Sequence, residues 1–90
     1  MEKKYIEKEV IRILRDIDSS SSTRRISEND IIGEILGNVP ENRDEFIMML
    51  KIMELIVAAE YKFGIKIKKD PRNFVSMKLR DFVDYIYYMT

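Results

Sequence analysis

Apolar residues recur with a helical period at the start of this chain. In residues 2–18 they stand three or four positions apart, the spacing that places side chains on one face of a helix. The stripe consists of Ile6, Val10, Ile13, Leu14 and Ile17. The polar segment 19–25, with four serines, offers almost nothing to bury and favours a loop. The pattern therefore predicts an amphipathic first helix followed by a loop.

A shorter helical signal follows this loop. Ser27 and Asp30 stand three residues apart and approximate a capping box, with Asp in place of the usual Glu. The apolar residues that come next are Ile31, Ile32, Ile35 and Leu36. Gly37 suits a left-handed residue at a helix carboxyl terminus. These signals predict a short helix that begins near Ser27.

The most apolar part of the chain is segment 46–63, in which fourteen of eighteen residues are apolar. Acidic residues precede it and suit a helix start near residue 41, and Gly64 ends it. A helix that is apolar on nearly all sides is typical of a central helix. We expect most of residues 46–50, with Ile52 and Met53, to pack in the core. Some of Ile47, Met48, Met49 and Lys51 should face outward toward a partner.

The last third of the chain contains two further helix starts. Asp70 and Pro71 read as a cap and a first helical residue, which predicts one turn through Phe74. Ser76 is expected to cap a final helix over residues 77–88, with a buried stripe of Leu79, Phe82, Val83 and Ile86. Together the patterns predict an all-α bundle of three to four helices, in one domain over residues 1–90, with a long loop after the first helix.

The composition argues against several kinds of chemistry. The chain has no His and no Cys, so it lacks the commonest general base, a thiol nucleophile and the commonest transition-metal ligands. It has only three glycines and no Gly-rich phosphate loop. The acidic residues Glu41, Asp44 and Glu45 suit a helix dipole or a docking patch better than a metal site. We therefore expect no enzymatic activity and no metal.

Charge and hydropathy limit the kinds of partner and the location that the sequence favours. Sixteen basic and sixteen acidic residues leave no net charge, which disfavours nucleic-acid binding. The longest apolar runs have five residues, far below the ~20 that cross a bilayer. Since no targeting signal opens the chain, the expected location is cytoplasmic. The basic residues of 66–72 are expected to be a solvated run, and at least one of Tyr85, Tyr87 and Tyr88 to point away from the core.

One segment is similar to a known family. Residues 54–67 read Glu-Leu-Ile-Val-Ala-Ala-Glu-Tyr-Lys-Phe-Gly-Ile-Lys-Ile. This resembles the Glu-Leu-x-x-x-x-Glu-x-x-Phe-Gly-Ile-x-Ile pattern at the end of the second helix of acyl carrier proteins. Residues 26–30 with Leu36-Gly37, and residues 82–86, resemble the family's loop and final helix, so the likeness covers most of the chain. It implies an acyl-carrier-protein-like bundle in fatty-acid, polyketide or peptide biosynthesis.

The resemblance fails at the family's modified residue. Acyl carrier proteins attach 4′-phosphopantetheine to the serine of an Asp-Ser-Leu triplet that opens the second helix. Aligned without a gap, this serine falls on Met49; with one extra helical turn it falls on Glu45, between Asp44 and Phe46. Neither residue has a hydroxyl, so the resemblance implies a member without the cofactor at this position. Modification of another serine remains an alternative.

Two functional hypotheses follow. The first is a carrier-protein-like module that docks, without a cofactor, onto a synthase or an acyl or phosphopantetheinyl transferase. Its docking residues would be Glu41, Asp44, Glu45, Met48, Met49 and Ile52. The second is a small helical adaptor or homodimer, unrelated to acyl transfer, whose long apolar helix pairs with another chain.

Overall fold

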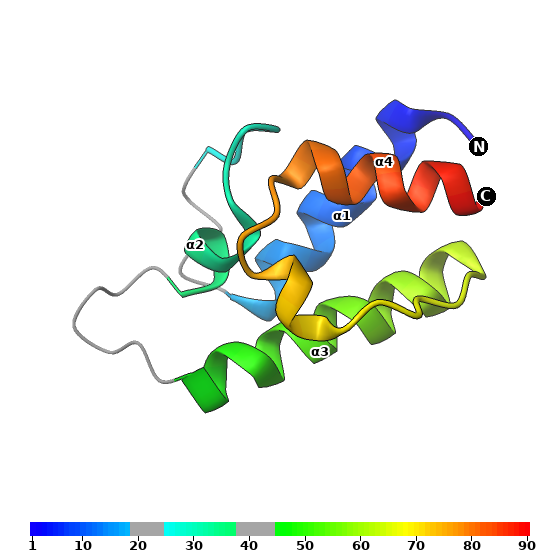
Figure 1. Ribbon diagram of the computed structural model, residues 1–90. Coiled ribbons are helices and arrows are strands. Elements are labelled where there is room, and N and C mark those ends of the chain that lie inside the picture. Colours follow the sequence, from blue (N-terminus) through cyan, green and yellow to red (C-terminus); the bar gives the residue numbers. More distant parts are fainter. Residues whose placement is uncertain (19–24, 38–44) are drawn as a thin grey trace.

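The computed structural model describes residues 1–18, 25–37 and 45–90, and this part of the chain is helical (Figure 1). The elements are α1 (Lys3–Ile17), α2 (Ile32–Leu36), α3 (Glu45–Phe63), the 3-10 turn η2 (Pro71–Phe74) and α4 (Leu79–Met89). Its β structure is limited, within these residues, to one isolated bridge between Ile31 and Lys78. The prediction of an all-α bundle is therefore confirmed.

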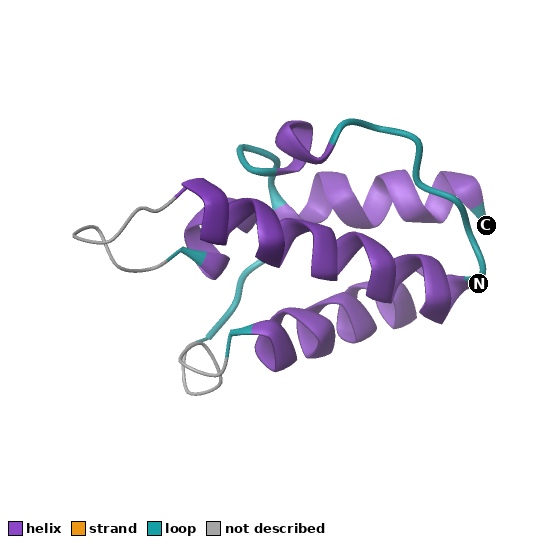
Figure 2. Ribbon diagram, turned by 90° about the horizontal axis from the view of Figure 1, so that it is seen from below, coloured by secondary structure: helices purple, strands orange, loops and turns teal. Residues whose placement is uncertain are grey.

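Helix α1 packs on both α3 and α4, and the two chain ends lie at the same end of the bundle (Figures 1 and 2). Its fully buried residues are Ile6, Val10 and Leu14, in steps of four along one face. Ile13 and Ile17 are only partly buried, because they lie on the flank that turns toward α3. The predicted helix is confirmed to within one residue at each end, whereas its single apolar stripe divides into two.

The core joins this face of α1 to α2, α3, η2 and α4. The buried rings of Phe74 and Phe82 lie at its centre, edge to face with centroids 5.3 Å apart. As predicted, α4 buries Leu79, Phe82, Val83 and Ile86. At its far end Asp84 accepts a hydrogen bond from Lys3 on α1, with 2.8 Å between the charged atoms, and this bond raises the pKa of Lys3.

The start of α4 differs from the prediction. The helix begins at Leu79, and Ser76 does not cap it. Instead, the backbone N–H groups of Leu79 and Arg80 donate to the backbone carbonyls of Asp30 and Glu28, at 2.8 and 2.9 Å. Carbonyls from a segment distant in the chain therefore accept from the N–H groups at the start of α4, which a nearby capping side chain would otherwise satisfy.

The segment that supplies these carbonyls is a turn rather than the start of α2. Ser27 and Asp30 pair as a capping box does: the Ser27 N–H donates to the Asp30 carboxylate at 2.8 Å, and Ser27 Oγ accepts from the Asn29 N–H at 3.3 Å. The pairing closes the turn over residues 28–30, and α2 begins only at Ile32. The predicted start of this helix is therefore wrong by about one turn.

Two other helix-end predictions have different outcomes. Gly37 follows α2, but its φ of −117° is not left-handed, so that part of the prediction is wrong. Gly64 has a φ of 64° and ends α3 with a residue that tolerates this conformation. Asp70 caps η2 as predicted, since its Oδ1 accepts from the Arg72 N–H at 2.9 Å.

The largest departure concerns α3. This helix buries only Ile52, Leu55, Ile56, Ala59 and Phe63. Its exposed apolar residues are Phe46, Ile47, Leu50, Met53, Val57 and Tyr61. The inner residues recur every three or four positions, and one face is enough to contact α1, α2 and η2. The expectation that most of residues 46–53 lie in the core is therefore wrong.

The remaining surface predictions concern the connector and the last turn. Lys66, Lys68, Lys69 and Arg72 are exposed, as expected for a solvated run. Tyr87 and Tyr88 point away from the core, whereas Tyr85 is partly buried against Phe74. In the described ranges, no helix is both long enough and apolar enough to cross a bilayer.

Candidate functional site

The predicted docking residues cluster at the start of α3. Glu45 is the first described residue of α3 and is exposed, and Met48 and Met49 are partly buried one turn further on. Glu41 and Asp44 lie outside the described residues. The structure therefore brings three of the six predicted residues together at one helix end.

Ile52 does not belong to this surface. Its side chain is fully buried in the core. It stands on the same helical face as Leu55, Ile56 and Ala59, and this face packs toward the other helices. The prediction that Ile52 contacts a docking partner is therefore wrong.

The start of α3 borders two adjoining hollows on the side of α2 and η2. One, of about 330 Å³, is lined by Glu45, Met48, Val75, Ser76 and residues of α2. The other, of about 240 Å³, is lined by Glu45, Met48, Met49, Arg72 and Val75. Thioethers and valine methyls form much of these walls and carboxylates their rim, which suits contact with a protein or an apolar ligand.

Backbone contacts hold the walls of these hollows in place. The Gly33 N–H donates to the Val75 carbonyl at 2.9 Å, and the Ile32 N–H donates to the Met77 carbonyl at 2.9 Å. Glycine is required at position 33, since a Cβ there would lie 2.5 Å from the Val75 carbonyl oxygen. The α2 wall and the segment after η2 are therefore pinned together.

Lys51 anchors α3 to the opposite side of this region. Its ammonium donates to the Leu36 carbonyl at 3.0 Å and lies 3.9 Å from the Asp18 carboxylate. The Leu36 carbonyl is at the end of α2, where no helical partner remains for it. One side chain thus connects the ends of α1 and α2 to α3, one turn beyond Met48.

Charge at the hollows is mixed. Glu34 and Glu45 border the larger hollow, and Arg72 borders the smaller one. The Arg72 guanidinium is engaged by Asp70, with 3.0 Å between Nη2 and Oδ2. Hydrogen bonds from the Arg72 side chain and backbone lower the pKa of Asp70, and the carboxylate raises the pKa of Arg72. The exposed carboxylate of Glu45 therefore lies near an arginine whose charge is already balanced by Asp70.

Ser76 supplies a hydroxyl close to the predicted docking residues. Its exposed side chain lines the larger hollow together with Glu45. The sequence predicts a helix cap at this serine, and only the fold brings it to this site. Among the described residues, three or more potential metal-ligating side chains nowhere form a cluster.

A second surface was only partly anticipated. Phe46 is 71% exposed, Val57 62% and Tyr61 91%, and with Leu50 and Met53 they form an apolar stripe along the outer face of α3. A signal for it was present, because Ile47, Leu50, Val57 and Tyr61 fit a three-and-four spacing that excludes the inner residues. The stripe extends the exposed apolar surface well beyond the start of the helix.

The described residues form a small helical bundle with apolar hollows at one end of α3 and an exposed apolar stripe along it. Comparisons with protein-family models, curated proteins and solved structures find no match for this chain. The resemblance to acyl carrier proteins therefore stays a prediction from the residues quoted above.

Proposed function

We propose that this chain is an acyl-carrier-protein-like docking module that does not carry phosphopantetheine at the family's usual position. One observation carries the proposal: Glu45, the position that the gapped alignment pairs with the modified serine, is exposed at the amino-terminal end of the described part of α3. The order of elements supports it, since the Phe-Gly-Ile-Lys-Ile segment leads from α3 to η2 and α4. The partner is a synthase or a transferase of a biosynthetic system.

The first test is the intact mass of the protein after incubation with coenzyme A and a broad-specificity phosphopantetheinyl transferase. We expect no mass gain while an ordinary carrier protein in the same tube is modified. A gain that peptide mapping places on Ser76, and that Ser76→Ala abolishes, would contradict the proposal.

Two serine substitutions distinguish the alignments. Glu45→Ser places a hydroxyl between Asp44 and Phe46, whereas Met49→Ser places one between Met48 and Leu50. Because Glu45 is exposed, its substitution should leave the thermal unfolding midpoint almost unchanged. We expect the transferase to modify Glu45→Ser and not Met49→Ser. The reverse result would favour the ungapped alignment.

Docking is tested by competition. An excess of the protein should slow the modification of an ordinary carrier protein, because both would occupy the transferase. Met48→Glu should relieve this inhibition, and Tyr88→Ala, far from the hollows, should not. An unchanged rate at a large excess of the wild-type protein would exclude docking on this transferase.

The exposed stripe on α3 favours a second candidate, a helical adaptor or homodimer that binds through this helix. Light scattering coupled to size exclusion measures self-association directly. A dimer that dissociates on Val57→Glu would support this candidate. Val57 is a sharper probe than the partly buried Met49, because a charge at Val57 disturbs the surface alone.

A further inference from the structure

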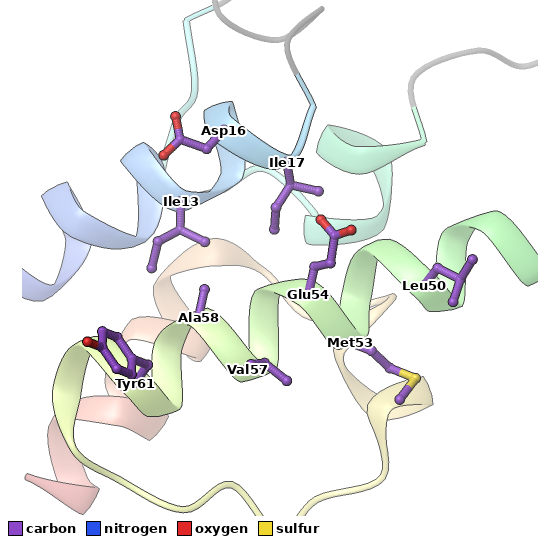
Figure 3. A pocket seen from close by; sticks show the side chains of 9 residues that line it. All are labelled: Ile13, Asp16, Ile17, Leu50, Met53, Glu54, Val57, Ala58 and Tyr61. Atoms are coloured by element: carbon purple, nitrogen blue, oxygen red, sulfur yellow. The ribbon is translucent and has the colours of Figure 1, made fainter.

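A groove between α1 and α3 adds a second binding surface, on a different flank of α3 from the two hollows (Figure 3). Its volume is about 770 Å³. Ile13 and Ile17 of α1 form one wall, and Leu50, Val57 and Tyr61 of α3 form the other. Apolar surface dominates this lining, and none of its residues is basic.

Two carboxylates interrupt the apolar lining. Glu54 extends from α3 toward Ile17, and Asp16 lies on the α1 rim (Figure 3). Both are exposed, and neither forms an ion pair or a side-chain hydrogen bond with the described part of the chain. The groove therefore combines an apolar wall with two carboxylates, of which Asp16 also borders a neighbouring hollow lined by Lys8, Arg12 and Arg15.

We propose that this groove binds an amphipathic helix of another protein, whose apolar row lies in the groove and whose flanking lysines or arginines face Glu54 and Asp16. The dimensions are suitable: Leu50 and Tyr61 are about 16 Å apart along the helix axis, which corresponds to three turns of a bound helix. The proposal does not rest on the carrier-protein hypothesis, since it uses neither Glu45 nor the hollows.

Charge argues against a second copy of this chain as the occupant. Glu54 stands beside the midpoint of the stripe from Phe46 to Tyr61. An antiparallel two-fold pairing centred on the stripe, or a parallel pairing in register, brings each Glu54 close to its own symmetry mate. Like charges at such a contact disfavour the pairing, whereas a basic partner neutralises them.

The test uses a fluorescein-labelled helical peptide of 18 residues, with leucines at its a and d positions and lysines at e and g. Fluorescence anisotropy should show saturable binding to the wild-type protein, and a peptide with glutamates in place of the lysines should bind at least tenfold more weakly. Val57→Gln, which removes an apolar contact without adding charge, should weaken binding of the lysine peptide at least tenfold, while Tyr88→Ala should leave it unchanged. Circular dichroism shows whether each variant is folded.

Charge reversal provides the decisive control. Glu54→Lys should weaken binding of the lysine peptide and strengthen binding of the glutamate peptide. A nonspecific apolar contact would not produce this exchange of preference. Equal affinity of both peptides for the wild-type protein, or no effect of Val57→Gln, would overturn the proposal. So would a stable dimer that loses self-association on Val57→Glu, because the groove would then be occupied by a second copy. None of these results changes the transferase assays above, which test the start of α3.

Discussion

Helices α3 and α4 distribute their apolar residues differently. α4 buries one apolar stripe against α1 and η2, and its exposed apolar residues are confined to the last turn, at Tyr87, Tyr88 and Met89. α3 has more apolar residues, yet a large share of them is exposed. The period of the pattern determines which residues are buried, whereas their number does not. Apolar residues that fall outside the buried face are then available for contact with another molecule.

The sharpest test of this contrast exchanges one aromatic residue for alanine on each helix. Phe82→Ala should lower the free energy of unfolding by about 3–5 kcal/mol, because a fully buried ring that packs on Phe74 is lost. Tyr61→Ala should change it by less than about 0.5 kcal/mol, since that ring is 91% exposed. Urea unfolding followed by circular dichroism measures both. Equal losses would mean that the outer face of α3 is covered by protein.

A second test concerns the lead-in to α4. Gly33→Ala should cost roughly 1–3 kcal/mol, because the new Cβ would meet the Val75 carbonyl and force two backbone segments apart. Gly37→Ala is the matched control: its Cβ meets the end of the flexible Met48 side chain and lies 3.0 Å from the Gly33 carbonyl oxygen, a milder backbone contact, so the loss should be smaller. A larger loss at position 37 would show that the Met48 contact, rather than the α2 backbone, holds this region.

The third test addresses how α3 is attached to α1 at its far end. Glu9 is 6% exposed, and its carboxylate lies 3.3 Å from both Lys62 of α3 and Arg12 of α1. Because both cations are largely solvated, Glu9→Gln should cost only about 1 kcal/mol. Glu7→Gln on the same helix serves as the control, with no measurable change in thermal unfolding expected. If Glu9→Gln were more stable than the wild-type protein, the interaction of Glu9 with Lys62 and Arg12 would not be a net attraction.

The smallest expected effect is pH-dependent and lies between the two helices, at η2. The pKa of Asp70 is lowered in the fold, so its ionised form adds stability above the unfolded pKa of about 3.9. That contribution disappears as the pH falls through the lowered pKa. Asp70→Asn keeps a capping oxygen but removes this dependence, so the two proteins should differ slightly at pH 7 and converge at the acid end. If the difference in stability between the two proteins grew on acidification instead, the ionised Asp70 carboxylate would be destabilising, contrary to the prediction.

Local signals predicted much of the fold. The Asp70-Pro71 cap and the stripe of α4 are correct because each depends on residues within a few positions of one another. The start of α4 was missed because its cap comes from Glu28 and Asp30, some fifty residues earlier in the chain. No local pattern encodes such a contact, and Ser76 was a plausible local substitute.

The candidate site was predicted in part for the same reason. Glu45, Met48 and Met49 lie together at the amino-terminal end of the described part of α3. The prediction of Ile52 as a docking residue fails because its three-and-four spacing with Leu55, Ile56 and Ala59 places it on the inner face. The hollows and Ser76 could not be predicted, because they depend on how α2 and η2 fold onto α3.

The carbonyls that cap α4 have a consequence for cooperativity. Because the amide protons of Leu79 and Arg80 are held by Asp30 and Glu28, they exchange with solvent only when the 27–32 turn separates from α4. The first turn of α4 and the 27–32 turn therefore open as one unit. Hydrogen exchange at two amides reports on a contact between segments that are far apart in the chain.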